Sequence, residues 1–191
     1  MSATAMTPTM GLGRPIQCND VGSGPASLVT VEEFGPPGGA IRQTKFTFNS
    51  ATFTLTRTSG AIASGGIQFY DLPKGNINIL NATAKITYSI AGAGSYSNLV
   101  SAVGSAVADT ANGTLTSTEA DVIASTATAS TSGAATFTGR LSSAPVLNGT
   151  STASDLYLNM ATSDDVTSSR VVTVTGWIIV TWINGGDNTI S

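Results

Sequence analysis

Beyond residue 40, apolar and polar side chains alternate along much of the chain, which is typical of β-strands with one buried face. The clearest example is residues 84–90, in which every second residue is apolar and the residues between are lysine, threonine and serine. The same spacing predicts strands around further apolar sets: Ile67 and Phe69; Ile77 and Ile79; Leu99, Val103 and Val107; and Leu156, Leu158 and Met160.

One strand-like segment changes the face of its apolar residues partway along. Phe46 and Phe48 occupy even positions, whereas Phe53 and Leu55 occupy odd positions. The switch falls at Asn49-Ser50, so a β-bulge or a tight turn is expected there. A further turn is expected over 71–75, because its proline fixes one φ and its glycine accepts a positive φ.

The last predicted strand, from about 171 to 183, carries apolar residues on both faces of its second half. Its even face is Val172, Val174, Ile178, Val180 and Trp182. Its odd face mixes threonines with Trp177, Ile179 and Ile183. A strand that is apolar on both faces is covered on both sides, here either by the same chain or by a second subunit. Trp177, Ile179 and Ile183 are therefore candidate interface residues.

Turn and cap signals separate these strands. The Asn-Gly pairs at 112–113 and 148–149 predict hairpins. Residues 116–119 fit a capping box, which predicts one or two helical turns ending by Ile123. Residues 124–136 are almost entirely small or hydroxylated and are interpreted as a strand edge or loop. About eight short strands at this spacing predict an all-β fold, a single β-sandwich or jelly-roll-like domain.

Residues 1–40 differ from this body. They hold five of the seven prolines together with many glycines, so regular structure is not expected over most of the stretch. One short strand is possible at 27–31. The sequence predicts an extended Pro/Gly-rich arm at 1–40 and a β-sandwich domain at 41–191. The arm is either a disordered tail or a segment that orders on a partner, and Pro36 and Pro37 join the candidate interface residues.

Composition excludes several classes of site. There is no histidine and one cysteine, so a Ser-His-Asp triad, an imidazole metal site and an intrachain disulfide are excluded. The eight Lys and Arg residues are scattered and the net charge is −3, which does not fit a nucleic-acid partner. No apolar run is long enough for a membrane span, and the N-terminus lacks signal-peptide features, so a soluble protein made in the cytoplasm is expected.

The small number of charged residues also affects whether copies of the chain associate with one another. Charged residues make up 10% of the chain, and charged side chains are what normally keep sheet edges from pairing. A defined oligomer is therefore expected. Acidic residues offer no arranged pair: Asp164-Asp165 is interpreted as a turn, and Glu119, beside Asp121, as a cap. No catalytic, cofactor or metal residues are assigned, and no enzyme is expected.

Aromatic rings leave one binding alternative open. Trp182 is in phase with the core face and is assigned to packing, whereas Trp177 meets either a neighbour or the core. Tyr96 lies among glycines and serines and is expected to be the most exposed ring. Exposed rings of this kind are the platforms of carbohydrate-binding β-sandwich modules.

Three stretches carry a family resemblance: 70–80 (YDLPKGNINIL), 115–121 (LTSTEAD) and 182–188 (WINGGDN). Their order and their Thr/Ala-rich background resemble capsid decoration (cement) proteins of tailed bacteriophages, over roughly residues 40–188. The resemblance implies a β-sandwich homotrimer, seated on the major capsid protein at the exterior of the virion, that stabilises contacts between capsomers after a period in the host cytoplasm. A tail, baseplate or fibre component is the alternative virion role.

Overall fold

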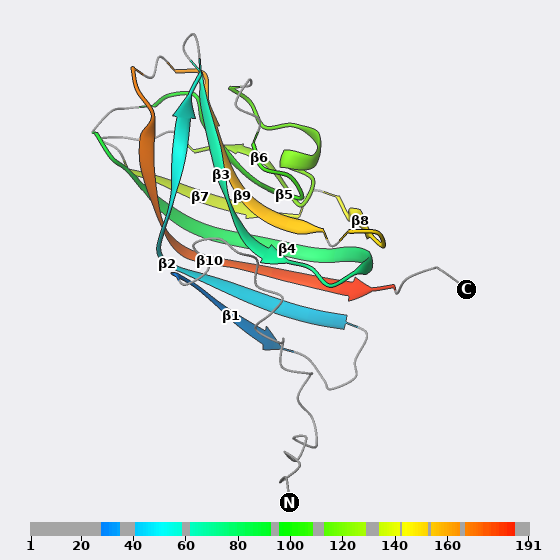
Figure 1. Ribbon diagram of the computed structural model, residues 1–191. Coiled ribbons are helices and arrows are strands. Elements are labelled where there is room, and N and C mark those ends of the chain that lie inside the picture. The colour runs from blue at the N-terminus through cyan, green and yellow to red at the C-terminus, as the bar shows by residue number, and fades with distance from the viewer. Residues whose placement is uncertain are drawn as a thin grey trace, which may run out of the picture.

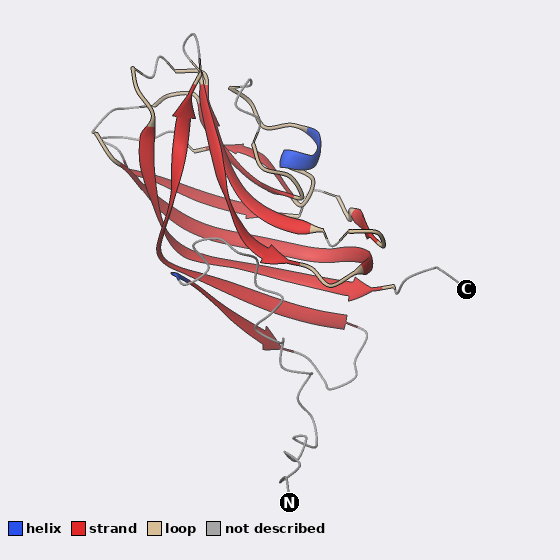
Figure 2. Ribbon diagram, viewed as in Figure 1, coloured by secondary structure: helices blue, strands red, loops and turns tan. Residues whose placement is uncertain are grey.

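The structure is a computed structural model, and it describes residues 28–34, 41–58, 62–92, 96–108, 113–128, 134–141, 143–152, 154–164 and 167–185. Strands account for nearly all of its regular structure (Figure 2). The strands are β1 (Val29–Phe34), β2 (Ile41–Arg57), β3 (Ala63–Asp71), β4 (Gly75–Ile90), β5 (Leu99–Gly104), β6 (Ile123–Ala127), β7 (Ala134–Arg140), β8 (Val146–Gly149), β9 (Asp155–Thr162) and β10 (Arg170–Asn184). A 3₁₀ turn, η3 (Ser117–Glu119), lies between β5 and β6.

The strands form one curled antiparallel sheet. Its order is β6-β5-β9-β3-β2-β10-β4-β7, with β1 added to β2 and β8 added to β4. Long β2 links the two halves of this sheet. β10 pairs with it from Ile41 to Leu55, β1 pairs with it over 43–48, and β3 pairs with its last two residues. The two halves face each other across the core (Figure 1). A bridge between Ile123 and Leu141 brings β6 next to the end of β7. The predicted all-β, β-sandwich or jelly-roll-like domain is confirmed.

The predicted break at Asn49-Ser50 is a β-bulge. Ser50 has a φ of 65°, and the β2–β10 register shifts there, so that Thr175 is opposite Asn49 and Val174 is opposite Ala51. Buried residues of β2 are Phe46 and Phe48 before the bulge and Ala51, Phe53 and Leu55 after it. The extra residue therefore keeps both apolar sets on the core side.

A second bulge lies in β4. The β4–β10 register skips Leu80, which is 42% exposed, between Ile79 and Asn81. This shift lets odd-numbered Ile77 and Ile79 share the core with the even-numbered set that ends at Ile90. The turn predicted over 71–75 is confirmed, since Gly75 begins β4 with a φ of 130°.

Aromatic side chains fill the centre of the core. The ring of Phe46 lies 4.9 Å from that of Phe69 and 4.8 Å from that of Tyr70, and Phe48 is 5.6 Å from Phe69. Edge and tilted contacts at these distances are favourable for aromatic pairs. The predicted sets in β3, β4 and β9 are buried, whereas Val107 after β5 is 50% exposed.

The connection from β5 to β6 packs on the outside of β9. The side chain of Asn159 is buried and holds this connection by accepting from the Ala108 amide at 3.0 Å and donating to the carbonyls of Ala106 and Glu119, both at 2.8 Å. The Thr116 amide donates to the Glu119 carboxylate at 3.0 Å, so the predicted cap is present. The helix it begins is one 3₁₀ turn, at the short end of the expectation.

Of the two hairpins predicted from Asn-Gly pairs, the one at 148–149 is wrong and the one at 112–113 falls partly outside the described residues. Asn148-Gly149 does not form a hairpin, because it lies inside β8, which pairs with the start of β4 and not with β9. The Asn148 side chain instead accepts from the amide and hydroxyl of Thr150. Asn112 lies outside the described residues.

The segment 124–136 contributes most of β6 and the start of β7, with residues 129–133 outside the described part.

Part of the predicted arm is described. Val29–Phe34 forms β1, which pairs with β2 from Val29 opposite Phe48 to Phe34 opposite Gln43. This strand starts two residues later than the short strand considered from sequence and extends beyond it. Residues 1–27 and 35–40, including Pro36 and Pro37, lie outside the described residues, so the extended arm remains a prediction.

Candidate interaction surface

The candidate interface residues of β10 lie on one face of the sheet. We define the outer face as the side of β1, β2, β10 and β4 that points away from the core. The core side of β10 is buried, including Trp182, as predicted. Trp177, Ile179 and Ile183 alternate with it and are half-buried. Trp177 is therefore not a core residue, and the described residues leave these three side chains partly open.

Cross-strand pairing joins these side chains to their neighbours. Trp177 lies between Thr47 of β2 and Lys85 of β4. Ile183 lies opposite Ile41, which is 52% exposed. Directly opposed residues of antiparallel strands stand side by side on one face. The pairing therefore makes an apolar stripe that runs along β10 and continues onto β2.

Ile179 stands in the middle of this stripe, between Lys45 of β2 and Thr83 of β4. Lys45 in turn forms an ion pair of 3.0 Å with Glu32 of β1. Such an exposed pair adds little stability, but it places opposite charges beside each other next to the apolar stripe. A partner therefore meets an apolar centre bordered by the Lys45–Glu32 ion pair and by Lys85.

The core side beneath the stripe is held rigidly. Trp182 Nε1 donates to the hydroxyl of Thr44 at 3.0 Å, and both residues are buried. The guanidinium of Arg42 lies 5.9 Å from the Trp182 ring and forms an ion pair of 3.1 Å with Glu33 of β1. These contacts join β1, β2 and β10, so the stripe rests on a fixed surface.

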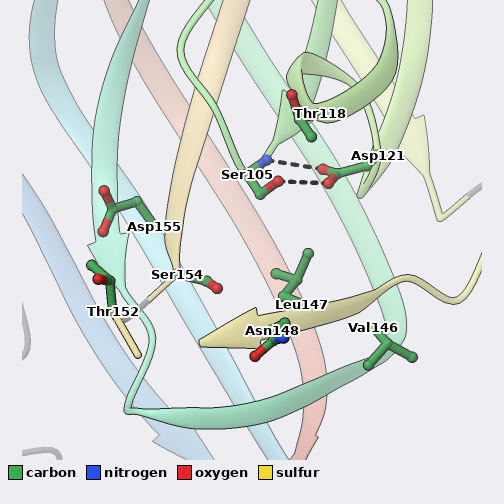
Figure 3. A pocket seen from close by; sticks show the side chains of 9 residues that line it. All are labelled: Ser105, Thr118, Asp121, Val146, Leu147, Asn148, Thr152, Ser154 and Asp155. Atoms are coloured by element: carbon green, nitrogen blue, oxygen red, sulfur yellow. Dashed lines mark hydrogen bonds between the residues drawn. The ribbon is translucent and has the colours of Figure 1, made fainter. Parts of the chain in front are cut away.

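A polar pocket of about 400 Å³ lies between β8, the start of β9 and the η3 connection (Figure 3). Its lining is Ser105, Thr118, Asp121, Val146, Leu147, Asn148, Thr152, Ser154 and Asp155. The pocket is open, and the carboxylates of Asp121 and Asp155 lie at opposite sides of it in this view. No sequence pattern indicated this pocket, because its parts come from distant segments.

Both carboxylates already have partners. Asp121 accepts from the Ser105 amide at 2.9 Å and from its hydroxyl at 2.6 Å, while burial raises the pKa of this carboxyl above its usual value. Asp155 accepts from the hydroxyl of Tyr157 at 3.1 Å and is opposite Asp71 in the β3–β9 register. Burial first, and then these two carboxylates, raise the pKa of Tyr157 to about 12. The pocket therefore offers hydroxyl, amide and carboxylate groups for polar contact.

The remaining sequence candidates are structural. Asp164 accepts from Ser97, Asn98 and Thr162, and so ties the loop before β5 to the end of β9. Asp165 lies outside the described residues. The expectation of an exposed Tyr96 is wrong, because its side chain is 5% exposed and belongs to the core cluster. The neighbouring glycines and serines had suggested a loop, and they carry no information on what the ring packs against.

Two kinds of larger feature are absent from the described part of the chain. Among the described residues, no helix has the length and apolar character needed to cross a membrane. In the same part of the chain, no three His, Cys, Asp or Glu residues are grouped so that they could hold a metal ion.

Comparisons with known proteins give little more. No family model matches the sequence, and no curated protein matches it. Among solved structures, a chain of infectious bursal disease virus Gx strain is 12% identical with a TM-score of 0.36, covering 78% of this chain and 33% of that one. A chain of the Gt strain is 13% identical with a TM-score of 0.37, covering 98% and 41%. This chain spans less than half the length of either, and a likeness this weak establishes no shared role.

Proposed function

We propose that this chain is a structural virion protein that decorates the outer capsid shell and stabilises contacts between capsomers. The observation that carries the proposal is the apolar stripe of Trp177, Ile179, Ile183 and Ile41 on a rigid sheet. Tryptophan and aliphatic side chains in such a setting are typical centres of protein interfaces. The resemblance to phage decoration proteins supplies the capsid shell as the partner and the homotrimer as the form of the unit.

The fold suits adhesion in a second way. A chain with 10% charged residues and several half-exposed apolar side chains gains free energy when another protein covers them. Covering the outer face removes apolar area from water without any rearrangement of the core. The role is thus met by binding alone, with no chemical step.

The alternative within the virion is a tail, baseplate or fibre component. Copy number separates the two roles, because a shell coat is present in hundreds of copies and tail parts in far fewer. Quantitative mass spectrometry of purified virions, with the major capsid protein as the internal standard, measures this ratio. Hundreds of copies per particle support decoration, whereas a few copies or none reject it.

A carbohydrate-binding module has less support. Tyr96 is buried, so the ring expected to form a platform does not reach a ligand. Trp177 remains, but it lies beside Thr47 and Lys85 on a sheet face, without a second described ring next to it. Glycan-array binding that disappears in Trp177→Ala would support this module, and failure to bind any glycan argues against it.

The outer face can be tested directly with matched variants. Ile41→Glu places a charge in the stripe at an already exposed position, and Val171→Glu makes the same change at an exposed position of β10 away from the stripe. Binding to undecorated capsids should fall at least tenfold in Ile41→Glu and stay unchanged in Val171→Glu. Equal binding by both variants would remove the stripe from the proposed contact.

A further inference from the structure

Within the described ranges, β1 is an edge strand. It pairs with β2 on one side, and no strand in the described ranges pairs with its other side (Figure 1). The backbone N–H and C=O groups along such an edge are a template for another strand. The opposite end of the sheet differs, because β6 meets the end of β7 through the bridge of Ile123 and Leu141.

Exposed apolar side chains mark both ends of this edge. Leu28, directly before β1, is 39% exposed, and Phe34, its last residue, is 50% exposed. They lie at equal sequence distances on either side of Val31. An antiparallel pairing of β1 with a second copy, centred on Val31, therefore brings each Leu28 opposite a Phe34 of the other copy.

Charge is compatible with this register. In a two-fold antiparallel pair, directly opposed residues lie on the same face of the sheet. The two-fold axis therefore passes midway between two copies of the same residue. An axis at Glu32 would put two Glu32 carboxylates against each other, which is unfavourable. An axis at Val31 instead places Glu32 opposite Thr30 and Glu33 opposite Val29, so no like charges are opposed.

We propose that two copies of this chain pair antiparallel through β1, centred on Val31, so that the sheet continues across a two-fold axis. The partner is a second copy, because the symmetric positions of Leu28 and Phe34 make the edge of β1 complementary to itself. The contact uses the edge of β1 and leaves the outer-face stripe free. Assemblies built on it contain an even number of copies: two if it acts alone, or six if it joins two trimers.

Position 30 provides the sharpest test. Thr30→Glu puts a carboxylate opposite Glu32 of the second copy, twice per pair, and should weaken the association about tenfold. Thr30→Lys should strengthen it by a similar factor. Within one copy the two changes have little net effect, because position 30 is diagonal to Lys45 on β2 and also two residues from Glu32 on the same face of β1. A change in folding stability alone would therefore not order the two variants in this way.

The experiment is sedimentation velocity of the full chain across a concentration series, with the thermal midpoint of each variant measured in parallel. The wild type should form an even-numbered assembly that separates into halves in Thr30→Glu and in the double variant Leu28→Ser, Phe34→Ser. Val107→Ser, at an exposed apolar position outside β1, should leave it intact.

Three results would overturn the proposal. One is a wild type that stays a monomer or a trimer at all concentrations. Another is an even-numbered assembly that both position-30 variants leave unchanged. The third is an assembly that is lost on deletion of residues 1–26 but is insensitive to position 30, which would place the chain's own N-terminal segment at this edge. Failure here leaves the decoration role intact, because that role is read from virion copy number and binding to shells.

Discussion

The indole Nε1 of Trp182 donates a 3.0 Å hydrogen bond to the hydroxyl of Thr44, with both side chains buried in the layer under the outer face. A buried donor that loses its acceptor keeps its desolvation cost. The pair therefore connects β10 to β2 directly beneath the apolar stripe, where a partner is proposed to bind.

This pair predicts a non-additive double-mutant cycle. Trp182→Phe should cost about 2 kcal/mol of unfolding free energy, from lost packing and an unsatisfied Thr44 hydroxyl. Thr44→Val should cost about 1 kcal/mol, because it leaves the indole without an acceptor. The double variant should be more stable than the sum of these losses implies, by about 1 kcal/mol. Urea titration measures all three, and strict additivity would argue that the bond contributes nothing.

Gly176 should not tolerate a side chain. Its φ is 123°, and a Cβ at this position would lie 2.2 Å from the carbonyl oxygen of Lys85 on β4. Gly176→Ala is expected to cost at least about 3 kcal/mol, since both the backbone conformation and the β10–β4 ladder must change. Gly185→Ala is the control, because the nearest atom there lies at 3.3 Å and the residue follows the end of β10. A similar thermal midpoint for both variants would contradict the strand geometry.

Asn159 should be essential for the β5–β6 connection. Asn159→Leu keeps similar volume but leaves the Ala108 amide and the carbonyls of Ala106 and Glu119 without their partner. The expected loss is about 3 kcal/mol, with increased hydrogen exchange confined to residues 105–122. Unchanged exchange in that segment would show that packing on Ala161 and Leu115 is enough to hold it.

Asp164 should make folding stability depend on acid pH. Burial acts to raise the pKa of this carboxyl, but hydrogen bonds from Asn98, Ser97 and Thr162 outweigh it and hold the pKa below its usual value. Because the folded-state pKa is the lower one, the stabilisation is present above the unfolded-state pKa and is lost as pH falls through the folded-state pKa. Asp164→Asn should therefore flatten the fall in thermal midpoint between about pH 5 and pH 3. An equally steep fall in the variant would assign the acid sensitivity to other carboxylates.

Local pattern was sufficient for much of the fold. The parity change between Phe48 and Phe53 located the bulge at Ser50, because only an extra residue keeps both apolar sets in one core. Burial of the even face of β10 could also be predicted, because side chains of a strand alternate between its two faces. The Glu119 cap followed from spacing alone, as it involves neighbours in sequence.

Features that depend on contacts between distant residues could not be predicted from the sequence. Asn148-Gly149 has the composition of a hairpin turn, but pairing with β4 decides its conformation. Tyr96 has polar and glycine neighbours, but its burial depends on the core cluster it joins. The pocket of Asp121 and Asp155 is assembled from three segments. Trp177, Ile179 and Ile183 are half-buried, and only the β2–β10 register shows that they form one stripe with Ile41.

A particle reconstruction of purified virions tests the proposed decoration role most directly. We expect a shell coated with this chain at regular positions, with Trp177, Ile179 and Ile183 covered by the shell protein or by a sister subunit. A reconstruction in which the chain is absent from the shell, or sits on it with that stripe facing solvent, would contradict the account.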